Sequence, residues 1–500
     1  MRRSSFLFLF IFLGVVTPAK ASDLYITQNG NGSGTSCSSP LSVAWFNSGR
    51  QITSGTTVHL CGQFTGGAGQ QLLVVRTNGV TVKFERGARL TSPAWSGLGA
   101  IYAQGLSNVV VDGGGTGVIE NTANGTGRAN RRSSVAIYFR GCNGCVVRNV
   151  TIGNLYVHTS VNDTAVDQTQ VNCVSFVSAD NITIDHVTCH DAGWAFAGMG
   201  NNFTLAHSDI YNIDHGLAFG ASGTMSGISI HDNHIHDFVN WDTTSNTYHH
   251  DGLHLWAEHG ARIINGAIFN NRFDGDSGVN ITGFIFLQES INRVAVYNNV
   301  FVTPSNRVMR SIWFYAPSTS LPGGPATGNS AHNNTANAGA HREGSGLMAD
   351  GQLNFSAYNN VLMGGQSDVS IRLGTTLSGM NNNVYVDLAS FSDNNTFGYN
   401  GKAYQQLAQW QSVCRCDANS KLVPPAQIHL SSTGQLLSGS AAVGAGANLT
   451  GIATGTLTTL ASDIIGAMRP GSGTWDAGAF QSGSTPAKPA AVGGVTATVH

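Results

Sequence analysis

A short motif returns along the middle of the chain and limits the folds open to it. Each copy alternates apolar, often β-branched residues, and then has Asn, Asp or His and a second apolar residue. The copies are NITIDHVT (181–188), NFTLAHSDI (202–210), GISIHDNHI (227–235), GAIFNNRF (266–273), RVAVYNNVF (293–301) and LNFSAYNNV (353–361). A repeat of about 20–30 residues built from period-two strands predicts a solenoid of stacked coils.

One position in each copy is expected to face the core, and its spacing gives the length of a coil. These positions are Ile184, Leu205, Ile230, Phe269, Val296 and Ala357, with steps of 21, 25, 39, 27 and 61 residues. We interpret the step of 39 as a coil with an inserted loop at 237–250, and the step of 61 as two coils. A leucine-rich repeat is disfavoured because its LxxLxL pattern is missing.

A second apolar strand accompanies most coils. The segments are GWAFAG (193–198), HGLAFG (215–220), DGLHLW (251–256), GFIFLQ (283–288), SIWFYA (311–316) and SIRLG (370–374). Equivalent strands of successive coils lie side by side, so we expect these segments to form one sheet. The sequence therefore predicts an all-β protein with a right-handed parallel β-helix.

The rest of the chain divides around this solenoid. Residues 1–21 have the basic start, short apolar run and small residues of a secretory signal peptide cleaved near Ala21. We expect an N-terminal cap at 22–64, the β-helix at 57–388, a closing region at 389–482, and a linker and tail at 483–500. The closing region should hold one α-helix within 402–413, with Tyr404, Leu407, Ala408 and Gln411 on one face, and a closing strand within 463–481.

The cysteine content indicates the cellular compartment, and the net charge indicates which classes of partner are favoured. Eight cysteines in an exported chain favour disulfides over metal binding. Cys37 and Cys61 are candidates for a disulfide that stabilises the N-terminal cap. Without the basic residues of the leader, the net charge is 22 − 27 = −5, which does not favour nucleic acid. We expect a secreted monomer without a membrane span.

Charge is unevenly distributed along the chain. Residues 149–261 contain no Lys or Arg but hold 12 acidic residues and 12 of the 17 histidines. Most of these side chains follow a repeat, where Asp and His commonly hydrogen-bond the turn. We assign this structural role to Asp180, Asp185, His186, His207, Asp209, His231 and Asp232.

The segment HHDGLHLW (249–256) is the exception, because it follows the inserted loop. If Leu253 and Leu255 face the core, the period-two rule turns His254 and Trp256 outward and leaves Asp251 at the strand entrance. Aromatic faces can stack on sugar rings, carboxylates can hold a cation or move protons, and Arg can clamp a uronate carboxylate. Later coils add Phe286, Gln288, Glu289, Arg310, Trp313, Tyr315, Arg342 and Arg372.

Over residues 23–482 the repeats, cap and closing segment resemble the pectate-lyase-like right-handed parallel β-helix superfamily. The resemblance implies extracellular polysaccharide cleavage, although the superfamily also contains epimerases and adhesins. HHDGLHLW is similar to HxDG-type strand starts of some β-helix polysaccharide enzymes, which points to His249, Asp251 and His254. The paired aspartates and GHG pattern of polygalacturonases and the DPH-type motif of alginate epimerases are missing, which disfavours those subfamilies.

The leading hypothesis is a polysaccharide lyase that cleaves a uronate-containing glycan by β-elimination. Asp251, Glu289 and Asp214 would bind Ca²⁺, which neutralises the substrate carboxylate. His254 or Arg310 would remove the adjacent proton. The residues expected to bind the glycan are His249, Trp256, Gln288, Trp313, Tyr315, Arg342 and Arg372.

Two other functions stay open from the sequence. One is an inverting glycoside hydrolase on a neutral polysaccharide, with Asp251 and Glu289 as a carboxyl pair about 6.5–9.5 Å apart. The other is a non-catalytic glycan-binding module or adhesin.

Overall fold

The computed structural model describes residues 22–49, 51–163, 170–239, 241, 249–278, 281–302, 310–337, 344–372, 374–388 and 396–483. The expected signal peptide, nearly all of the expected tail and most of the inserted loop therefore lie outside the described residues. Within the described ranges, the structure contains no helix long and apolar enough to cross a membrane.

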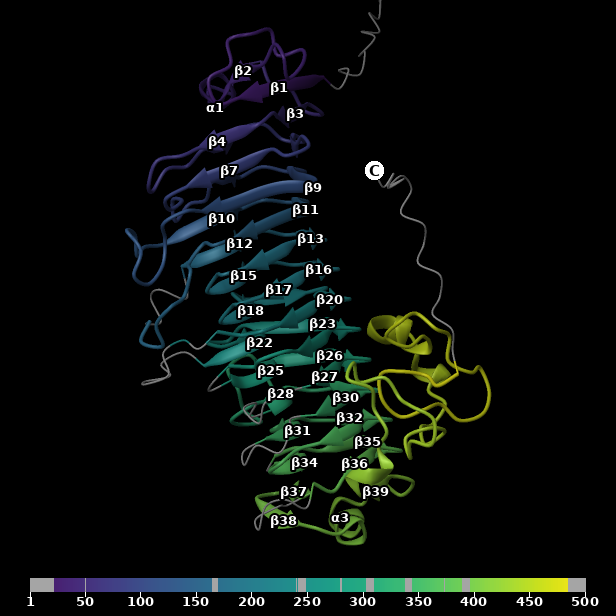
Figure 1. The fold of residues 1–500 in the computed structure, drawn as a ribbon. Coiled ribbons are helices and arrows are strands. Elements are labelled where there is room, and N and C mark those ends of the chain that lie inside the picture. Colours follow the sequence, from purple (N-terminus) through teal and green to yellow (C-terminus); the bar gives the residue numbers. More distant parts are fainter. Residues whose placement is uncertain are drawn as a thin grey trace, which may run out of the picture.

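The chain winds into a right-handed parallel β-helix (Figure 1). One 13-stranded sheet takes one strand from each coil, and all its pairings are parallel except the last, between β37 and β38. Its strands are β5 (Leu73–Val75), β8 (Ile101–Gln104), β10 (Ser134–Arg140), β12 (Val171–Val177), β15 (Trp194–Gly198), β18 (His215–Gly220), β22 (His250–Ala257), β25 (Ile281–Glu289), β28 (Arg310–Tyr315), β31 (Ser345–Asp350), β34 (Ser367–Ile371), β37 (Phe397–Tyr399) and β38 (Lys402–Tyr404). Five of the six segments expected to share a sheet form strands of this one, and the sixth, SIRLG, contributes Ser370 and Ile371 to β34.

The other side of the coils forms a 26-stranded sheet that bends at the repeat corners. Its strands are β1 (Asp23–Thr27), β2 (Leu41–Ser42), β3 (Thr57–Leu60), β4 (Gln63–Thr65), β6 (Thr81–Phe84), β7 (Arg89–Ser92), β9 (Val110–Asn121), β11 (Val146–Gly153), β13 (Thr183–Asp185), β14 (Thr188–His190), β16 (Thr204–Ala206), β17 (Asp209–Tyr211), β19 (Thr224–Ser226), β20 (Ser229–His231), β21 (His234–His236), β23 (Arg262–Phe269), β24 (Arg272–Asp274), β26 (Ile291–Tyr297), β27 (Val300–Val302), β29 (Ser330–His332), β30 (Thr335–Asn337), β32 (Phe355–Tyr358), β33 (Val361–Met363), β35 (Leu377–Asn381), β36 (Val384–Val386) and β39 (Lys421–Val423).

The repeat places one apolar residue per coil in a continuous internal row. The row runs through Ile184, Leu205, Ile230, Ile268, Val296, Ala331 and Ala357, all of which are buried. The expectation for Phe269 was therefore wrong by one residue: Ile268 faces the core, while Phe269 stacks outside on His231 and Tyr297. Ala331 shows that the step of 61 residues holds two coils.

A ladder of buried asparagines supports the corners of the later coils. Its members are Asn233, Asn271, Asn299, Asn334, Asn360 and Asn383. The side-chain amide of each donates to the Oδ1 atom of the next at 2.9–3.1 Å, and also to a backbone carbonyl of an earlier coil. Because buried amides without partners are costly, each member depends on its neighbours.

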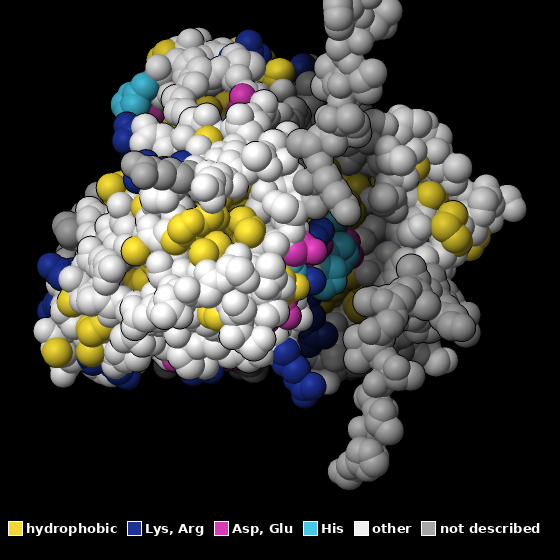
Figure 2. Space-filling model, turned by 90° about the horizontal axis from the view of Figure 1, so that it is seen from above, with side chains coloured by type: hydrophobic (Ala, Val, Ile, Leu, Met, Phe, Trp, Pro, Cys, Tyr) yellow, Lys and Arg dark blue, Asp and Glu magenta, His cyan; other side chains and the backbone are white. Residues whose placement is uncertain are grey.

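Histidine and aspartate occupy many of the other corners. His186, His207 and Asp232 have positive φ angles, which short polar residues at turns tolerate well. Nδ1 of His207 lies 2.8 Å from Oδ1 of Asp185. Viewed from the N-terminal end, histidine and acidic side chains gather on the side of the β-helix next to the C-terminal segment (Figure 2). The contact between His207 and Asp185 joins the corners of two successive coils.

Disulfides and short helices close the two ends. At the N-terminal end, α1 (Val43–Asn47) packs on β5, and Cys37 is bonded to Cys61. The cysteines of the CxxC pair, Cys142 and Cys145, are bonded to each other, as are Cys173–Cys189 and Cys414–Cys416.

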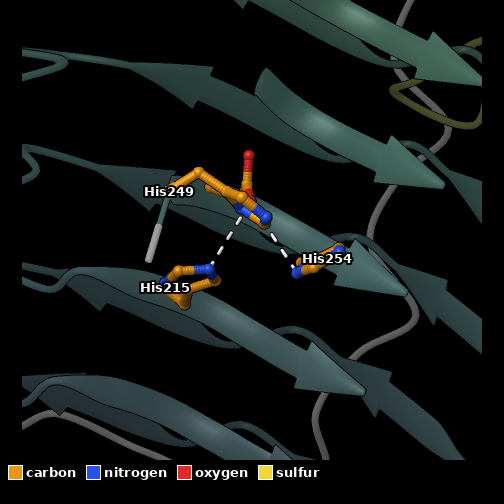
Figure 3. Close-up of side chains that lie close together, drawn as sticks. His215, His249 and His254 are labelled. Carbon is orange, nitrogen blue, oxygen red and sulfur yellow. Dashed lines mark hydrogen bonds and ion pairs between the residues drawn. The ribbon is translucent and has the colours of Figure 1, made fainter. Parts of the chain in front are cut away.

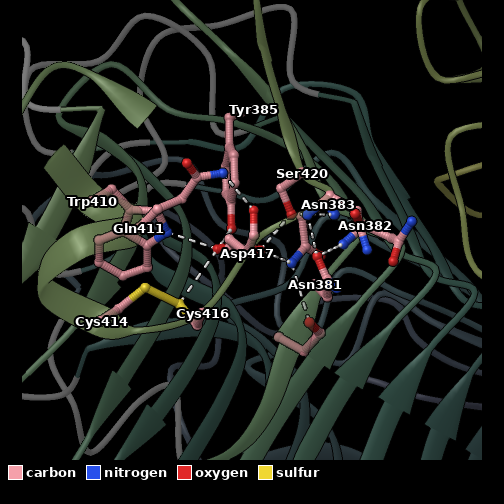
Figure 4. Close-up of a disulfide and its surroundings, with 12 residues drawn as sticks. Asn381, Asn382, Asn383, Tyr385, Trp410, Gln411, Cys414, Cys416, Asp417 and Ser420 are labelled. Carbon is pink, nitrogen blue, oxygen red and sulfur yellow. Dashed lines mark hydrogen bonds between the residues drawn. A yellow bond between two sulfur atoms is a disulfide. The ribbon is translucent and has the colours of Figure 1, made fainter. Parts of the chain in front are cut away.

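At the C-terminal end, α3 (Leu407–Cys414) covers the last coil. Buried Asp417 accepts hydrogen bonds from Tyr385 at 2.6 Å and from Trp410 at 2.7 Å (Figure 4). The expected helical face was wrong in detail, because Tyr404 belongs to β38 and Trp410 is the residue that α3 buries.

The last described segment packs along the outside of the 26-stranded sheet. It contains the short 3-10 helices η1 (Pro425–Gln427), η2 (Thr450–Ile452) and η3 (Gly455–Ala461). The closing strand expected within 463–481 is not formed; this stretch makes turns, and Trp475 packs beside Tyr297. Its contacts come from side chains such as Arg469, which donates to Asn298 at 3.0 Å, and not from strand pairing.

Candidate active site

The candidate site lies where β18 and β22 enter the 13-stranded sheet. Gly216 and Gly252 face the core there, and a Cβ on Gly252 would lie 2.7 Å from the ring of Phe273. The register between β22 and β25 shifts between His250 and Asp251, and the side chains of His215 and Asp251 lie close to each other. These two residues are register partners in adjacent strands.

Three imidazole rings surround the carboxylate of Asp251. Its Oδ2 atom lies 2.7 Å from Nδ1 of His249, 3.5 Å from Nε2 of His215 and 3.8 Å from Nδ1 of His254. Figure 3 shows the three rings turned toward a common point. The structure thus brings the polar residues of the HHDGLHLW motif together and adds His215, which sequence reasoning missed. Its position beside Asp251 follows from the register between coils.

Buried charges polarise this cluster. Burial disfavours the charged form of His215, but the charges of Asp214 and Asp251 outweigh it and raise the pKa of His215 to about 9. Burial likewise disfavours ionised Asp251, yet the charge of His249 and hydrogen bonds from the rings hold its pKa well below the usual range. For His254 burial dominates and lowers the pKa to about 3. At neutral pH a charged ring and a neutral ring flank an ionised carboxylate.

A chain of hydrogen bonds runs from His254 to the edge of the site. Nε2–H of His254 donates to Oε1 of Gln288 at 3.0 Å, and Nε2 of Gln288 donates to Oε1 of Glu258 at 2.6 Å. Glu258 is therefore held in place by a neighbouring coil. Sequence reasoning missed Glu258, because it follows the end of β22 and belongs to no repeated pattern.

These residues line a pocket of about 250 Å³ on the outer face of the sheet. The lining consists of Trp194, His215, His249, His254, Trp256, Glu258 and Gln288. Trp194 and Trp256 also line an adjoining, mostly apolar hollow of about 420 Å³ toward the N-terminal coils. Together the two hollows form a groove with aromatic walls.

Aromatic rings continue from the pocket toward the C-terminal coils. The ring of Phe286 stacks on His254 at 4.7 Å and on Trp313 at 4.5 Å between centroids. The guanidinium carbon of Arg310 lies 4.0 Å from the centroid of Trp313. A further hollow of about 620 Å³ includes Tyr315, Asp350 and Arg372 in its lining.

Most residues expected to bind the glycan lie along this one face. Trp256, Gln288 and Tyr315 occupy equivalent positions in successive strands of the sheet. Arg372 lies 3.4 Å from Asp350, which also accepts a hydrogen bond from Trp313 at 2.6 Å. Arg342 lies outside the described residues.

Two catalytic expectations need correction. We expected Asp251 as a calcium ligand or as one of a catalytic carboxyl pair, but its side chain is wholly buried beneath the imidazoles and cannot contact a polymer. We also expected His254 as a base, but one ring nitrogen donates to Gln288 and the other faces Asp251. Both residues therefore shape the floor of the pocket.

The three residues expected to bind Ca²⁺ do not converge. Asp214 lies behind His215, with its Oδ2 2.5 Å from Nδ1 of that ring. Glu289 lies near Glu258, whose charge helps to raise its pKa. Asp251 belongs instead to a group with His215, His249 and His254, whose ligand atoms lie within 4.8 Å of one another. Calcium takes six to eight oxygen ligands, so this nitrogen-rich set does not fit it.

No family model and no curated protein matches this sequence. Solved structures show a distant likeness. The Streptococcus pneumoniae surface protein and adhesin PfbA is 11% identical, with 76% of this chain and 94% of that chain covered and a TM-score of 0.47. The Azotobacter vinelandii mannuronan C-5 epimerase AlgE6 A-module is 13% identical, with 76% and 92% covered and a TM-score of 0.47.

The pectate lyase Pel9A is 13% identical, with 93% of this chain and 97% of that chain covered and a TM-score of 0.39. The two sheets of this chain define it as a parallel β-helix protein by themselves, and the likenesses carry no further argument. They concern the fold alone.

Proposed function

We propose that the protein is an enzyme that cleaves a uronate-containing polysaccharide by β-elimination, with the glycan lying along the 13-stranded sheet. One observation carries the proposal: a pocket floored by imidazoles opens beside Trp194 and Trp256, whose rings lie edge to face with centroids 6.3 Å apart, in an aromatic groove. Aromatic rings stack on sugar faces, and a groove extending over several coils suits a polymer better than a small molecule.

Arginines beside the groove support an acidic sugar as the substrate. Arg310 begins the second strand along from β22, and its guanidinium lies over Trp313. A guanidinium stacked on an indole keeps its charge, so Arg310 suits a carboxylate clamp better than a base. Arg372 provides a second positive group farther along the same face.

Glu258 is the group we assign to proton abstraction. It lines the pocket, and Gln288 orients it from the adjacent strand. Carboxylates can remove protons next to a carbonyl group where positive groups stabilise the developing charge. Glu258 takes the proton beside the uronate carboxylate, the electron pair forms the carbon–carbon double bond, and the glycosidic C–O bond breaks. The leaving oxygen takes a proton from water.

One observation favours a glycoside hydrolase as the second candidate. Burial and the charge of Glu258 raise the pKa of Glu289. A carboxyl group with a raised pKa suits the general acid of a hydrolase. In that case Glu258 and Glu289 would be the pair, since Asp251 is covered by imidazoles.

The test is incubation of the purified protein with uronate polysaccharides and, in parallel, with neutral polysaccharides. A lyase makes an unsaturated uronate that absorbs in the ultraviolet, together with new reducing ends. New reducing ends without that absorbance would overturn the lyase proposal in favour of the hydrolase. Binding without new ends on any glycan would overturn both and favour a non-catalytic module.

A further inference from the structure

The cluster beneath the pocket has the donor atoms of a transition-metal site. Nε2 of His215, Nδ1 of His249 and Nδ1 of His254 each face Oδ2 of Asp251, at 3.5, 2.7 and 3.8 Å. In a tetrahedral zinc site with bonds of about 2.0–2.1 Å, ligand atoms are about 3.4 Å apart. The observed separations bracket this value, so small ring rotations could place all four atoms around one ion.

The hydrogen bonds behind the ligands also suit a metal. Nδ1–H of His215 donates to Asp214 at 2.5 Å, so a metal ion that displaces the proton on Nε2 would meet the lone pair of that atom at the cluster. Nε2–H of His254 donates to Gln288, which leaves its Nδ1 lone pair toward the same point. Metal-binding histidines usually have such partners on the opposite nitrogen, where they fix the tautomer and the direction of the ring.

We propose that His215, His249, Asp251 and His254 bind one divalent transition-metal ion, such as Zn²⁺, at the floor of the pocket. Imidazole and carboxylate ligands suit zinc and its neighbours in the first transition series, whereas calcium requires oxygen ligands. All three imidazoles line the pocket. An ion bound by them is therefore reachable by a ligand in the groove.

The position of the ion gives it a role toward the substrate. By expanding from four to five ligands, an ion at the floor would take the carboxylate of a uronate as its fifth ligand and make the adjacent proton more acidic. This second part rests on the proposed function, whereas metal binding rests on the four side chains alone.

Three other groups of histidine and aspartate provide an internal comparison. They are Asp185–His186–His207, His207–His231–Asp232 and Asp209–His234–His236. These groups lie at corners of the 26-stranded sheet and are exposed or half-buried. His207 belongs to two of them, so it supplies a matched control for histidines of the pocket.

The test is a metal titration of the full chain without any glycan. The protein is stripped with a chelator and titrated with Zn²⁺ by calorimetry, with Co²⁺ absorption as the probe of tetrahedral geometry. We expect one tight equivalent, a higher melting temperature with Zn²⁺, and no comparable binding of Ca²⁺. Absence of a tight equivalent in the wild-type protein would overturn the inference.

Variants locate the site. His249→Ala removes a ring whose side chain is 37% exposed, so the chain should fold and its zinc affinity should fall by at least about tenfold. Gln288→Ala, which changes no ligand, should lower the affinity about 10–100-fold. His207→Ala should leave the tight equivalent unchanged. Loss of that equivalent in His207→Ala but not in His249→Ala would contradict the assignment.

The outcomes separate this inference from the proposed function. Tight zinc binding in a protein that releases no unsaturated uronate would support the metal site and overturn the lyase. Release of unsaturated uronate by a protein with no tight zinc site would support the lyase and overturn the metal site.

Discussion

His249 and Asp251 join the surface of the site to its interior. Nδ1 of His249 lies 2.7 Å from Oδ2 of Asp251; 37% of the histidine side chain is exposed, whereas that of the aspartate is wholly buried. A ligand in the pocket can therefore contact the exposed part of the His249 ring, which also interacts with the buried carboxylate of Asp251. This relationship makes Asp251 a positioning residue, whose removal should affect both stability and turnover.

The first prediction concerns Asp251→Asn, which keeps the shape but removes the charge. We expect the free energy of unfolding to fall by about 3 kcal/mol, because buried ion pairs are costly to break. Turnover should fall at least about 100-fold. Asp185→Asn, at a corner, is the control, with a loss of about 1 kcal/mol and unchanged turnover. Denaturant unfolding and initial rates measure both, and wild-type behaviour of Asp251→Asn would contradict the buried site.

The second prediction separates Glu258 from Glu289. Glu258→Gln should lower turnover by at least about 100-fold with little change in stability, because Glu258 lies at the edge of the pocket. Glu289→Gln should retain turnover if the enzyme is a lyase. Initial rates on the most active polysaccharide decide this. Equal losses in the two variants would indicate the carboxyl pair of a hydrolase instead.

The third prediction is a pH dependence of stability that arises at His332. Complete burial lowers its pKa from 6.5 to about 4. Above pH 6.5 the ring is neutral in both the folded and the unfolded protein, and as pH falls the unfolded chain takes up the proton first. The stability that His332 contributes is therefore lost between pH 6.5 and about 4, by about 3 kcal/mol.

The measurement is denaturant unfolding of the wild type and of His332→Gln across this pH range. The difference between the two proteins isolates His332 from the carboxylates, which also titrate there. We expect the variant to lose less stability than the wild type on acidification. Parallel curves would show that His332 does not carry the effect.

The fourth prediction tests the asparagine ladder. Asn334→Ala removes the donor to Asn360 and the acceptor for Asn299, so two buried amides lose a partner. We expect a loss of about 2–4 kcal/mol, since an unpaired buried polar group costs about 1–3 kcal/mol. Asn419→Ala, at an exposed position, should change the free energy of unfolding by less than about 0.5 kcal/mol. Chemical denaturation of both variants makes the comparison.

The fold was accessible from the sequence because each coil repeats the same local pattern. Period-two strands and the spacing of Ile184, Leu205 and Ile230 were enough to predict the solenoid and the shared sheet. The prediction that Phe269 faces the core was wrong, because Ile268 and Phe269 are adjacent apolar residues and either fits the pattern. The prediction of a closing strand was wrong because residues 463–481 are held by side-chain contacts with the coils. No local sequence pattern indicates such contacts.

Only part of the site could be predicted from the sequence. HHDGLHLW identified His249 and His254, but strict alternation breaks down at Asp251 and Gly252, where Gly252 faces the core and the strand register shifts. The contact with His215 depends on the register between coils of unequal length. Glu258 is likewise placed by Gln288 from the next coil. Such cross-coil contacts follow from stacking, which a single sequence does not specify.

The most direct test of the account is a crystal structure of Glu258→Gln with an oligosaccharide of the uronate polysaccharide that the wild type degrades. The account predicts a sugar in the pocket beside Trp194 and Trp256, with its carboxylate toward the imidazole floor and the chain continuing past Trp313. A sugar bound only at the corners of the 26-stranded sheet, or a pocket that stays empty at saturating oligosaccharide, would contradict it.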